Sequence, residues 1–259
     1  MIKLSICSEL RRYDTKYNKG NLSKYLGAYD RWGTPKGVDV ADTMSGTTSD
    51  QTSPAMTGED SALSVSEEDA MRAGFYGLLA RVLSGPMDDD ALSAMRALDG
   101  HDDGSPLGQA IASFGKLSVR NSVAKAEEEY TELFYGVGAG GELTPYASFY
   151  IMGLIYDKPL AELRSDMKRL GIEVADGSSE PEDHIASICE MMHGLLTGTL
   201  GGPNGRAEAK AFFDKHLAPW ADRFFVDLEG AQSAVLYMPV GTIGRLFMEI
   251  EREAFEMAA

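Results

Sequence analysis

The chain has 259 residues, of which 44% are hydrophobic and 25% are charged, the balance of an ordinary globular protein rather than a disordered or fibrous one. Its 40 acidic and 24 basic side chains give a net charge of −16, which repels phosphate backbones and excludes nucleic acid as an expected partner. The two cysteines, Cys7 and Cys189, are too few for a disulfide framework, and no apolar run is long enough to cross a bilayer. We therefore expect a cytoplasmic protein without a membrane span.

Charge and composition divide the chain near residue 65. Residues 1–36 carry eight basic and three acidic side chains, whereas residues 37–60 contain no Lys or Arg and show no apolar periodicity. Arg11 and Arg12 are not followed by an apolar stretch, so we do not expect the protein itself to be exported. We expect residues 1–65 to form a poorly ordered extension and linker, and residues 66–259 to form one helical domain.

Helix signals recur through residues 66–259. Apolar residues at helical spacing lie between hydroxyl or acidic caps and Gly or Pro stops. The expected helices are 67–84, 88–99, 106–117, 121–134, 158–170, 181–197, 206–216, 219–229 and 232–256, the last bent at Pro239. The predicted fold is all-α, a single helical bundle of about eight to ten helices with a polar hinge loop near 171–180. A strand within 146–156 is the alternative that this aromatic, β-prone segment leaves open.

The sequence offers little for catalysis or metal binding. Glu190 and His193 have the Glu-x-x-His spacing of di-iron bundles, but a second such pair is absent and the other histidines are scattered. Cys189 lies within an apolar helical stripe, where a thiol behaves as a core residue. The glycine-rich loop 136–141 lacks the strand and the Lys-Ser/Thr of a phosphate-binding loop, although weak nucleotide binding there stays open because such loops form anion nests. We therefore expect no enzyme, no metal and no firmly bound cofactor.

Two other segments stand out. The first, Tyr130 to Phe134, ends an acidic helix before the glycine-rich loop, and the second, Glu180 to His184, leads into a helix after a polar loop. Asp183 has two interpretations: a first-turn charge that favours the helix dipole, or an acceptor for a ligand's arginine that also orients His184. A cationic His184 would oppose the dipole, so we expect its ring to be neutral or paired with an acid.

These segments carry a resemblance to a known family. A Tyr-x-x-Leu-Phe segment followed by Glu-Pro-x-Asp-His about fifty positions later resembles the TorD/DmsD family of redox-enzyme maturation chaperones. Segments 75–80 and 212–220 are similar to other parts of that family, so the resemblance covers about residues 66–256. Carried over by motif, the resemblance implies a client- or leader-binding site made of Tyr130, Leu133, Phe134, Glu180, Pro181, Asp183 and His184.

The resemblance implies an all-helical, non-catalytic cytoplasmic chaperone, either a monomer or a homodimer. Such a chaperone binds the twin-arginine leader, the apo form, or both, of a molybdopterin-containing oxidoreductase precursor and delays export until the cofactor is inserted. The net negative charge of this chain is consistent with such a ligand, because a cationic and apolar leader needs an acidic rim beside an apolar groove. The alternatives are a helical metal- or nucleotide-binding enzyme and a helical scaffold for another protein.

Overall fold

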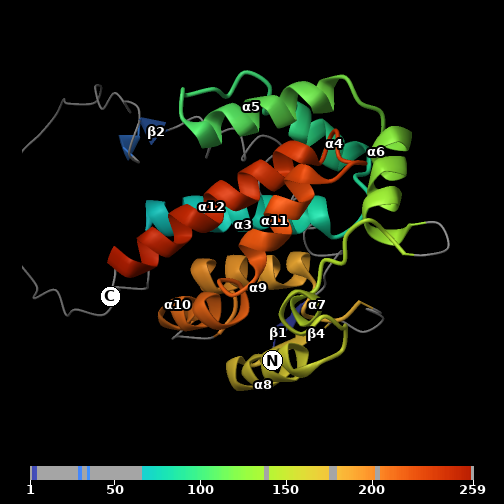
Figure 1. Cartoon of the computed structure of the whole chain (residues 1–259). Coiled ribbons are helices and arrows are strands. Elements are labelled where there is room, and N and C mark those ends of the chain that lie inside the picture. Colours follow the sequence, from blue (N-terminus) through green and yellow to red (C-terminus); the bar gives the residue numbers. More distant parts are fainter. Residues whose placement is uncertain are drawn as a thin grey trace, which may run out of the picture.

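The computed structural model describes residues 2–4, 29–30, 34–35, 66–136, 140–174, 180–201 and 205–257. Over these residues the fold is all-α, as predicted, with only two short strand pairs beside the helices (Figure 1). The helices, including one π-helix labelled η1, are α3 (Glu67–Leu83), α4 (Asp89–Arg96), α5 (Pro106–Val119), α6 (Val123–Tyr130), η1 (Thr131–Tyr135), α7 (Ala147–Met152), α8 (Lys158–Leu170), α9 (Ile185–Thr197), α10 (Gly205–His216), α11 (Ala221–Gly230) and α12 (Met238–Met257).

The helix starts follow the capping residues in the sequence. Side-chain oxygens of the cap residues accept backbone N–H bonds from the first turn, which satisfies donors that have no partner within the helix. The caps of α3, α4, α5 and α6 that do so are Ser66, Asp88, Ser105 and Ser122. The local cap signal therefore explains why these helices begin within two residues of the predicted positions.

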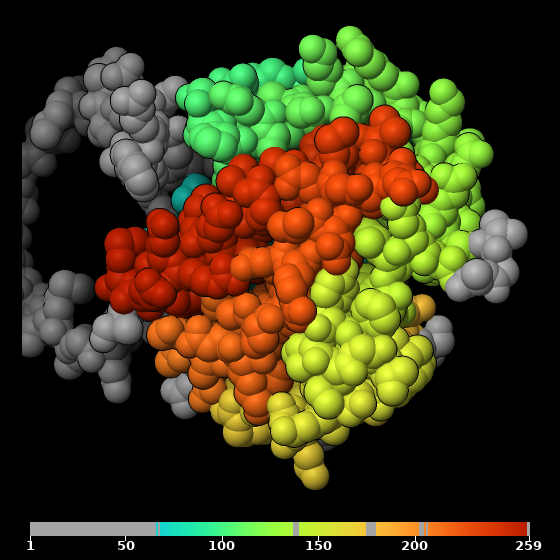
Figure 2. Space-filling view, viewed as in Figure 1, coloured from blue at the N-terminus to red at the C-terminus, as the bar shows by residue number. Residues whose placement is uncertain are grey.

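The bundle is built around α3. This helix packs along α9, while α12 packs against α11, α5 and α3. Figure 1 shows α12 crossing in front of α3, with α5 on one side and α9 on the other, and Figure 2 shows α11 and α12 covering the front of the molecule. A buried ion pair ties α3 to α12, since Arg72 donates to Glu251 at 2.6 and 3.0 Å and Tyr76 donates to the same carboxylate at 2.9 Å.

Two predicted helices begin four or more residues later than expected. The helix expected over 232–256 starts at Met238, so Pro239 lies in the first turn, where a missing N–H breaks no helical hydrogen bond and causes no bend. The preceding loop is held by Glu129, whose buried carboxylate accepts from the N–H groups of Val235 and Tyr237, both at 2.8 Å. The helix expected from Pro181 starts at Ile185.

The segment 146–156 forms a helix rather than a strand. Residues Ala147–Met152 make α7, and the strand alternative is wrong apart from one antiparallel bridge between Tyr146 and His184. The expected helix 121–134 is also divided, since α6 ends at Tyr130 and a π-helical turn continues the chain to Tyr135.

The described part of the predicted hinge loop includes a strand that pairs with another strand. Strand β4 (Ile172–Val174) runs parallel to β1 (Ile2–Leu4), and β2 (Tyr29–Asp30) is antiparallel to β3 (Thr34–Pro35). Hinge residues 175–179, glycine-loop residues 137–139 and most of the expected extension 1–65 lie outside the described residues. The division of the chain at residue 65 stays a prediction.

Candidate functional site

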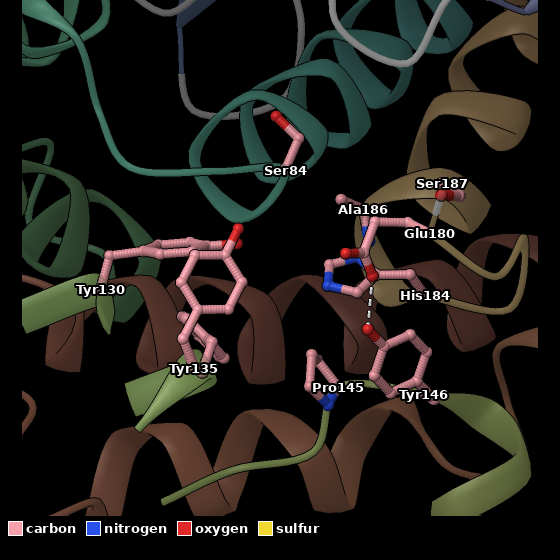
Figure 3. Close-up of a pocket in the computed structure, with 10 residues that line it drawn as sticks. Ser84, Tyr130, Tyr135, Pro145, Tyr146, Glu180, His184, Ala186 and Ser187 are labelled. Carbon is pink, nitrogen blue, oxygen red and sulfur yellow. Dashed lines mark hydrogen bonds between the residues drawn. The ribbon is translucent and has the colours of Figure 1, made fainter. Parts of the chain in front are cut away.

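The two signature segments meet at one pocket. The pocket has a volume of about 100 Å³ and lies between the end of α6 with η1 and the start of α9 (Figure 3). Figure 3 shows Tyr130 and Tyr135 on one side of the pocket, with Tyr146 and the His184 ring on the other. Its lining residues are Ser84, Tyr130, Phe134, Tyr135, Pro145, Tyr146, Glu180, His184, Ala186 and Ser187.

The π-helical turn shapes the first wall of the pocket. The N–H of Gly136 donates to the carbonyl of Thr131 at 2.6 Å, five residues back, and Gly136 has a φ of +67°, which a residue with a Cβ rarely adopts. A Cβ at this position would lie 1.8 Å from the carbonyl oxygen of Gly140. The returning loop then donates from Leu143 to the carbonyl of Leu133 at 2.8 Å. Glycine is thus required where the turn closes.

Aromatic rings pack together along this wall. The centroid of the Tyr130 ring lies 4.7 Å from that of Phe134 and 5.4 Å from that of Tyr135. The Tyr130 hydroxyl donates to the carbonyl of Leu83 at 3.0 Å, and burial raises its pKa well above the usual range. Tyr130 is therefore a neutral, buried side chain in the wall of the pocket. Tyr135 is 55% exposed and lies at the edge of the pocket.

His184 is the cap residue of α9, and of the two states expected from the sequence, a neutral ring or one paired with an acid, its surroundings favour the neutral ring. Its Nδ1 accepts the backbone N–H of Ala186 at 3.1 Å, so the hydrogen of the neutral ring is on Nε2. Burial lowers the pKa of His184 to about 4, because a charged ring would lose its hydration there. The ring therefore offers an Nε2–H donor rather than a positive charge at neutral pH.

Tyr146 links the second wall to a carboxylate. Its hydroxyl donates to Oε2 of Glu180 at 2.5 Å, and its ring lies edge-on to His184 with centroids 5.2 Å apart. Burial, together with the bond to Glu180, raises the pKa of Tyr146 well above the usual range. Glu180 itself is exposed, so this carboxylate lies at the edge of the pocket in contact with solvent.

Asp183 does not line the pocket. Its carboxylate is 1% exposed, and Oδ2 accepts from the N–H and the hydroxyl of Ser148 at 2.8 and 2.5 Å. Its carbonyl accepts from Ala147 at 2.9 Å, and Ile185 donates to Pro145 at 2.9 Å, which pairs the two chain segments. The first-turn interpretation of Asp183 is wrong, because α9 begins at Ile185 with His184 as its cap. Asp183 instead anchors the start of α7.

The structure thus separates the predicted site residues into two groups. Tyr130, Phe134, Glu180 and His184 line the pocket, whereas Leu133, Pro181 and Asp183 are buried beside it. The sequence analysis missed Tyr146 and Ser187. Ser187 lines the pocket but is only 2% exposed, and its buried Oγ has no hydrogen-bond partner. Its position three residues after His184 on α9 was the signal available in the sequence.

An exposed apolar segment follows Tyr146 in the chain. Six of the eight residues from 149 to 156 are large apolar or aromatic side chains that are 39–67% exposed. They are Phe149, Ile151, Met152, Leu154, Ile155 and Tyr156. Figure 2 shows this part of the chain, in yellow-green, at the surface beside α11. A surface of this kind marks an interaction site more often than a scattered apolar residue does.

The described residues offer no group of three His, Cys, Asp or Glu side chains that could hold a metal ion. Cys189 is fully buried, and burial raises the pKa of its thiol. Among the described helices, none is both long and apolar enough to span a membrane.

Comparison with known proteins assigns the family. A family model described as nitrate reductase delta subunit matches residues 101–226. The chaperone protein TorD of Vibrio parahaemolyticus is 35% identical over 150 residues, which cover 54% of this chain and 69% of that protein. The chain belongs to the TorD/DmsD family. Its family member DmsD of Salmonella typhimurium, named as a Tat proofreading chaperone, is 26% identical over 143 residues, covering 53% of this chain and 66% of DmsD.

A solved structure is also similar. It is that of a putative redox enzyme maturation protein from Archaeoglobus fulgidus, with 20% identity and a TM-score of 0.49. The match covers 69% of this chain and 94% of that chain. Both TorD and DmsD are named as chaperones, and the helical fold predicted for their family is the fold of this chain over the described residues.

Proposed function

We propose that this protein is a cytoplasmic chaperone that binds the twin-arginine leader of a molybdopterin oxidoreductase precursor and delays its export until the cofactor is inserted. The observation that carries the proposal is the meeting of the two signature segments at one pocket, where Tyr130 lies across from Glu180 and His184 (Figure 3) and Phe134 also contributes to the lining. The name of the Salmonella relative, a Tat proofreading chaperone, points to the same class of client.

The chemistry of the site suits such a leader. Its cationic part would meet an acidic protein of net charge −16 with the carboxylate of Glu180 at the pocket edge. Its apolar part would bury the exposed side chains between 149 and 156, which follow the pocket residue Tyr146 in the chain. Leu133, Pro181 and Asp183, as buried residues, would hold the walls in place rather than touch the client.

Leader titration tests the proposal. Synthetic leaders of the molybdopterin oxidoreductases encoded in the same genome are titrated by calorimetry, with a scrambled peptide of equal composition as control. We expect at least one leader to bind, the scrambled peptide not to bind, and affinity to fall modestly with salt, because screening weakens the attraction between partly exposed charges. Folded protein that binds none of the leaders contradicts the proposal.

A further inference from the structure

We propose that the pocket holds a single arginine side chain of the bound leader and prefers arginine to lysine. This inference rests on the proposed function and deepens it, since it names the side chain that the pocket selects. It assigns the recognising carboxylate to Glu180 and not to the buried Asp183.

The size of the pocket favours one side chain over a small molecule. Sites that enclose a cofactor or a drug-sized ligand are typically about 300–1,000 Å³. At about 100 Å³, the pocket has room for the end of one side chain and not for a nucleotide.

The walls of the pocket suit a planar cation. Figure 3 shows Tyr130 and Tyr135 on one side of the open space and the rings of Tyr146 and His184 on the other, and Phe134, which packs on Tyr130, also lines the pocket. A guanidinium group stacks on aromatic faces and is weakly hydrated, whereas an ammonium group is compact and strongly hydrated. Desolvation between such rings therefore costs lysine more than arginine.

The polar groups match the donors of a guanidinium. Glu180 is the one pocket residue with a formal charge among the described residues, because burial keeps the His184 ring neutral. Tyr146 engages one of its carboxylate oxygens, Oε2, at 2.5 Å. The other carboxylate oxygen, Oε1, is left to accept an N–H of the guanidinium.

His184 adds a requirement for a peptide. Since its Nδ1 accepts from Ala186, its Nε2–H is a donor, and a guanidinium has no acceptor for it. A peptide carbonyl beside the arginine can accept this hydrogen bond. The pocket is thus complementary to an arginine within a peptide chain rather than to the free guanidinium ion.

Peptide substitution tests the inference. In a leader that binds, each arginine is replaced in turn by lysine, which keeps the charge, and by citrulline, which keeps the planar shape. At one of the two positions we expect both replacements to weaken binding about tenfold or more, since each removes one of the two features that the pocket recognises.

Variants of the protein test whether the pocket residues recognise the arginine. Glu180→Gln keeps an acceptor for Tyr146 but removes the charge, and it should weaken wild-type leader binding while reducing the penalty for citrulline. The matched control is Glu182→Gln, because the Glu182 carboxylate pairs with Arg164 at 2.8 Å and does not line the pocket. Thermal unfolding of each variant confirms that it is folded.

The outcomes separate the two proposals. If no leader binds to folded protein, the proposed function fails. If the leader binds but lysine changes the affinity less than about twofold at both positions, or if Glu180→Gln behaves as Glu182→Gln does, the leader is recognised elsewhere and the arginine pocket is refuted.

Discussion

Asp183→Ala should destabilise the protein far more than it weakens leader binding. The side chain is 1% exposed and accepts two hydrogen bonds from Ser148, at 2.8 and 2.5 Å. Hydrogen bonds to a charged group are each worth about 1.5–3 kcal/mol, and the substitution leaves the buried donors of Ser148 without that acceptor. Loss of the buried charge itself offsets part of this, so we expect the free energy of unfolding to fall by about 3 kcal/mol.

The measurement is urea unfolding followed by circular dichroism, beside leader titration at a temperature where the variant is fully folded. A loss of about 3 kcal/mol corresponds to a fall in Tm of about 6–12 °C for a domain of this size. Ser148→Ala removes only the hydroxyl bond and should cost less. In a double-mutant cycle, Asp183 and Ser148 should show a coupling energy of about 0.5–3 kcal/mol.

Two results would refute this reasoning. Unfolding of Asp183→Ala within about 0.5 kcal/mol of the wild type, the usual range for surface substitutions, would show that the buried bonds contribute nothing. A folded Asp183→Ala variant that loses as much leader affinity as Glu180→Gln would show that Asp183 contacts the arginine after all. The first result concerns the fold, and the second concerns the assignment of the pocket carboxylate.

Three further predictions follow from buried or strained groups. Glu251→Ala leaves the guanidinium of Arg72 without its buried carboxylate and should lower the free energy of unfolding by about 3–5 kcal/mol in urea unfolding, with Glu251→Gln intermediate. Gly136→Ala forces a Cβ into the closed π-turn at a φ of +67°, so calorimetry should show a loss of about 1–3 kcal/mol in stability and weaker leader binding. The pKa of His184 is about 4 in the folded protein and ordinarily 6.5. Between pH 4 and pH 6.5 the unfolded chain therefore binds more protons than the folded protein does. Stability should therefore fall as pH drops from 6.5 to 4, by about 3 kcal/mol, and this fall should be smaller in His184→Gln.

Most of the helices could be predicted because their signals are local. A cap such as Ser66 and a stop such as Gly171 act within one turn, so they can be recognised without knowing what the helix packs against. The start of α12 could not be predicted in this way. The loop before it is fixed by the carboxylate of Glu129, more than one hundred residues earlier in the chain, and local periodicity contains no trace of that contact.

The site could be predicted only in part for the same reason. The motif residues Tyr130, Phe134, Glu180 and His184 line one pocket, while their role in client binding stays a prediction. Tyr146 reaches that pocket through backbone pairing of 145–147 with 183–185, which is a tertiary contact. Asp183 has the same sequence context whether it faces a ligand or Ser148, so only the structure could decide which residue its carboxylate contacts.

The apolar segment between 149 and 156 lies on and after α7, the helix that Asp183 anchors. Such a run normally indicates burial, yet its large side chains are 39–67% exposed. The backbone is held from both sides: Asp183 fixes Ser148, and Tyr150 donates to Asp227 on α11 at 2.9 Å. Exposed apolar surface gains nothing for the isolated fold, so the anchoring of this short helix is what the proposed binding of a client at this segment would require.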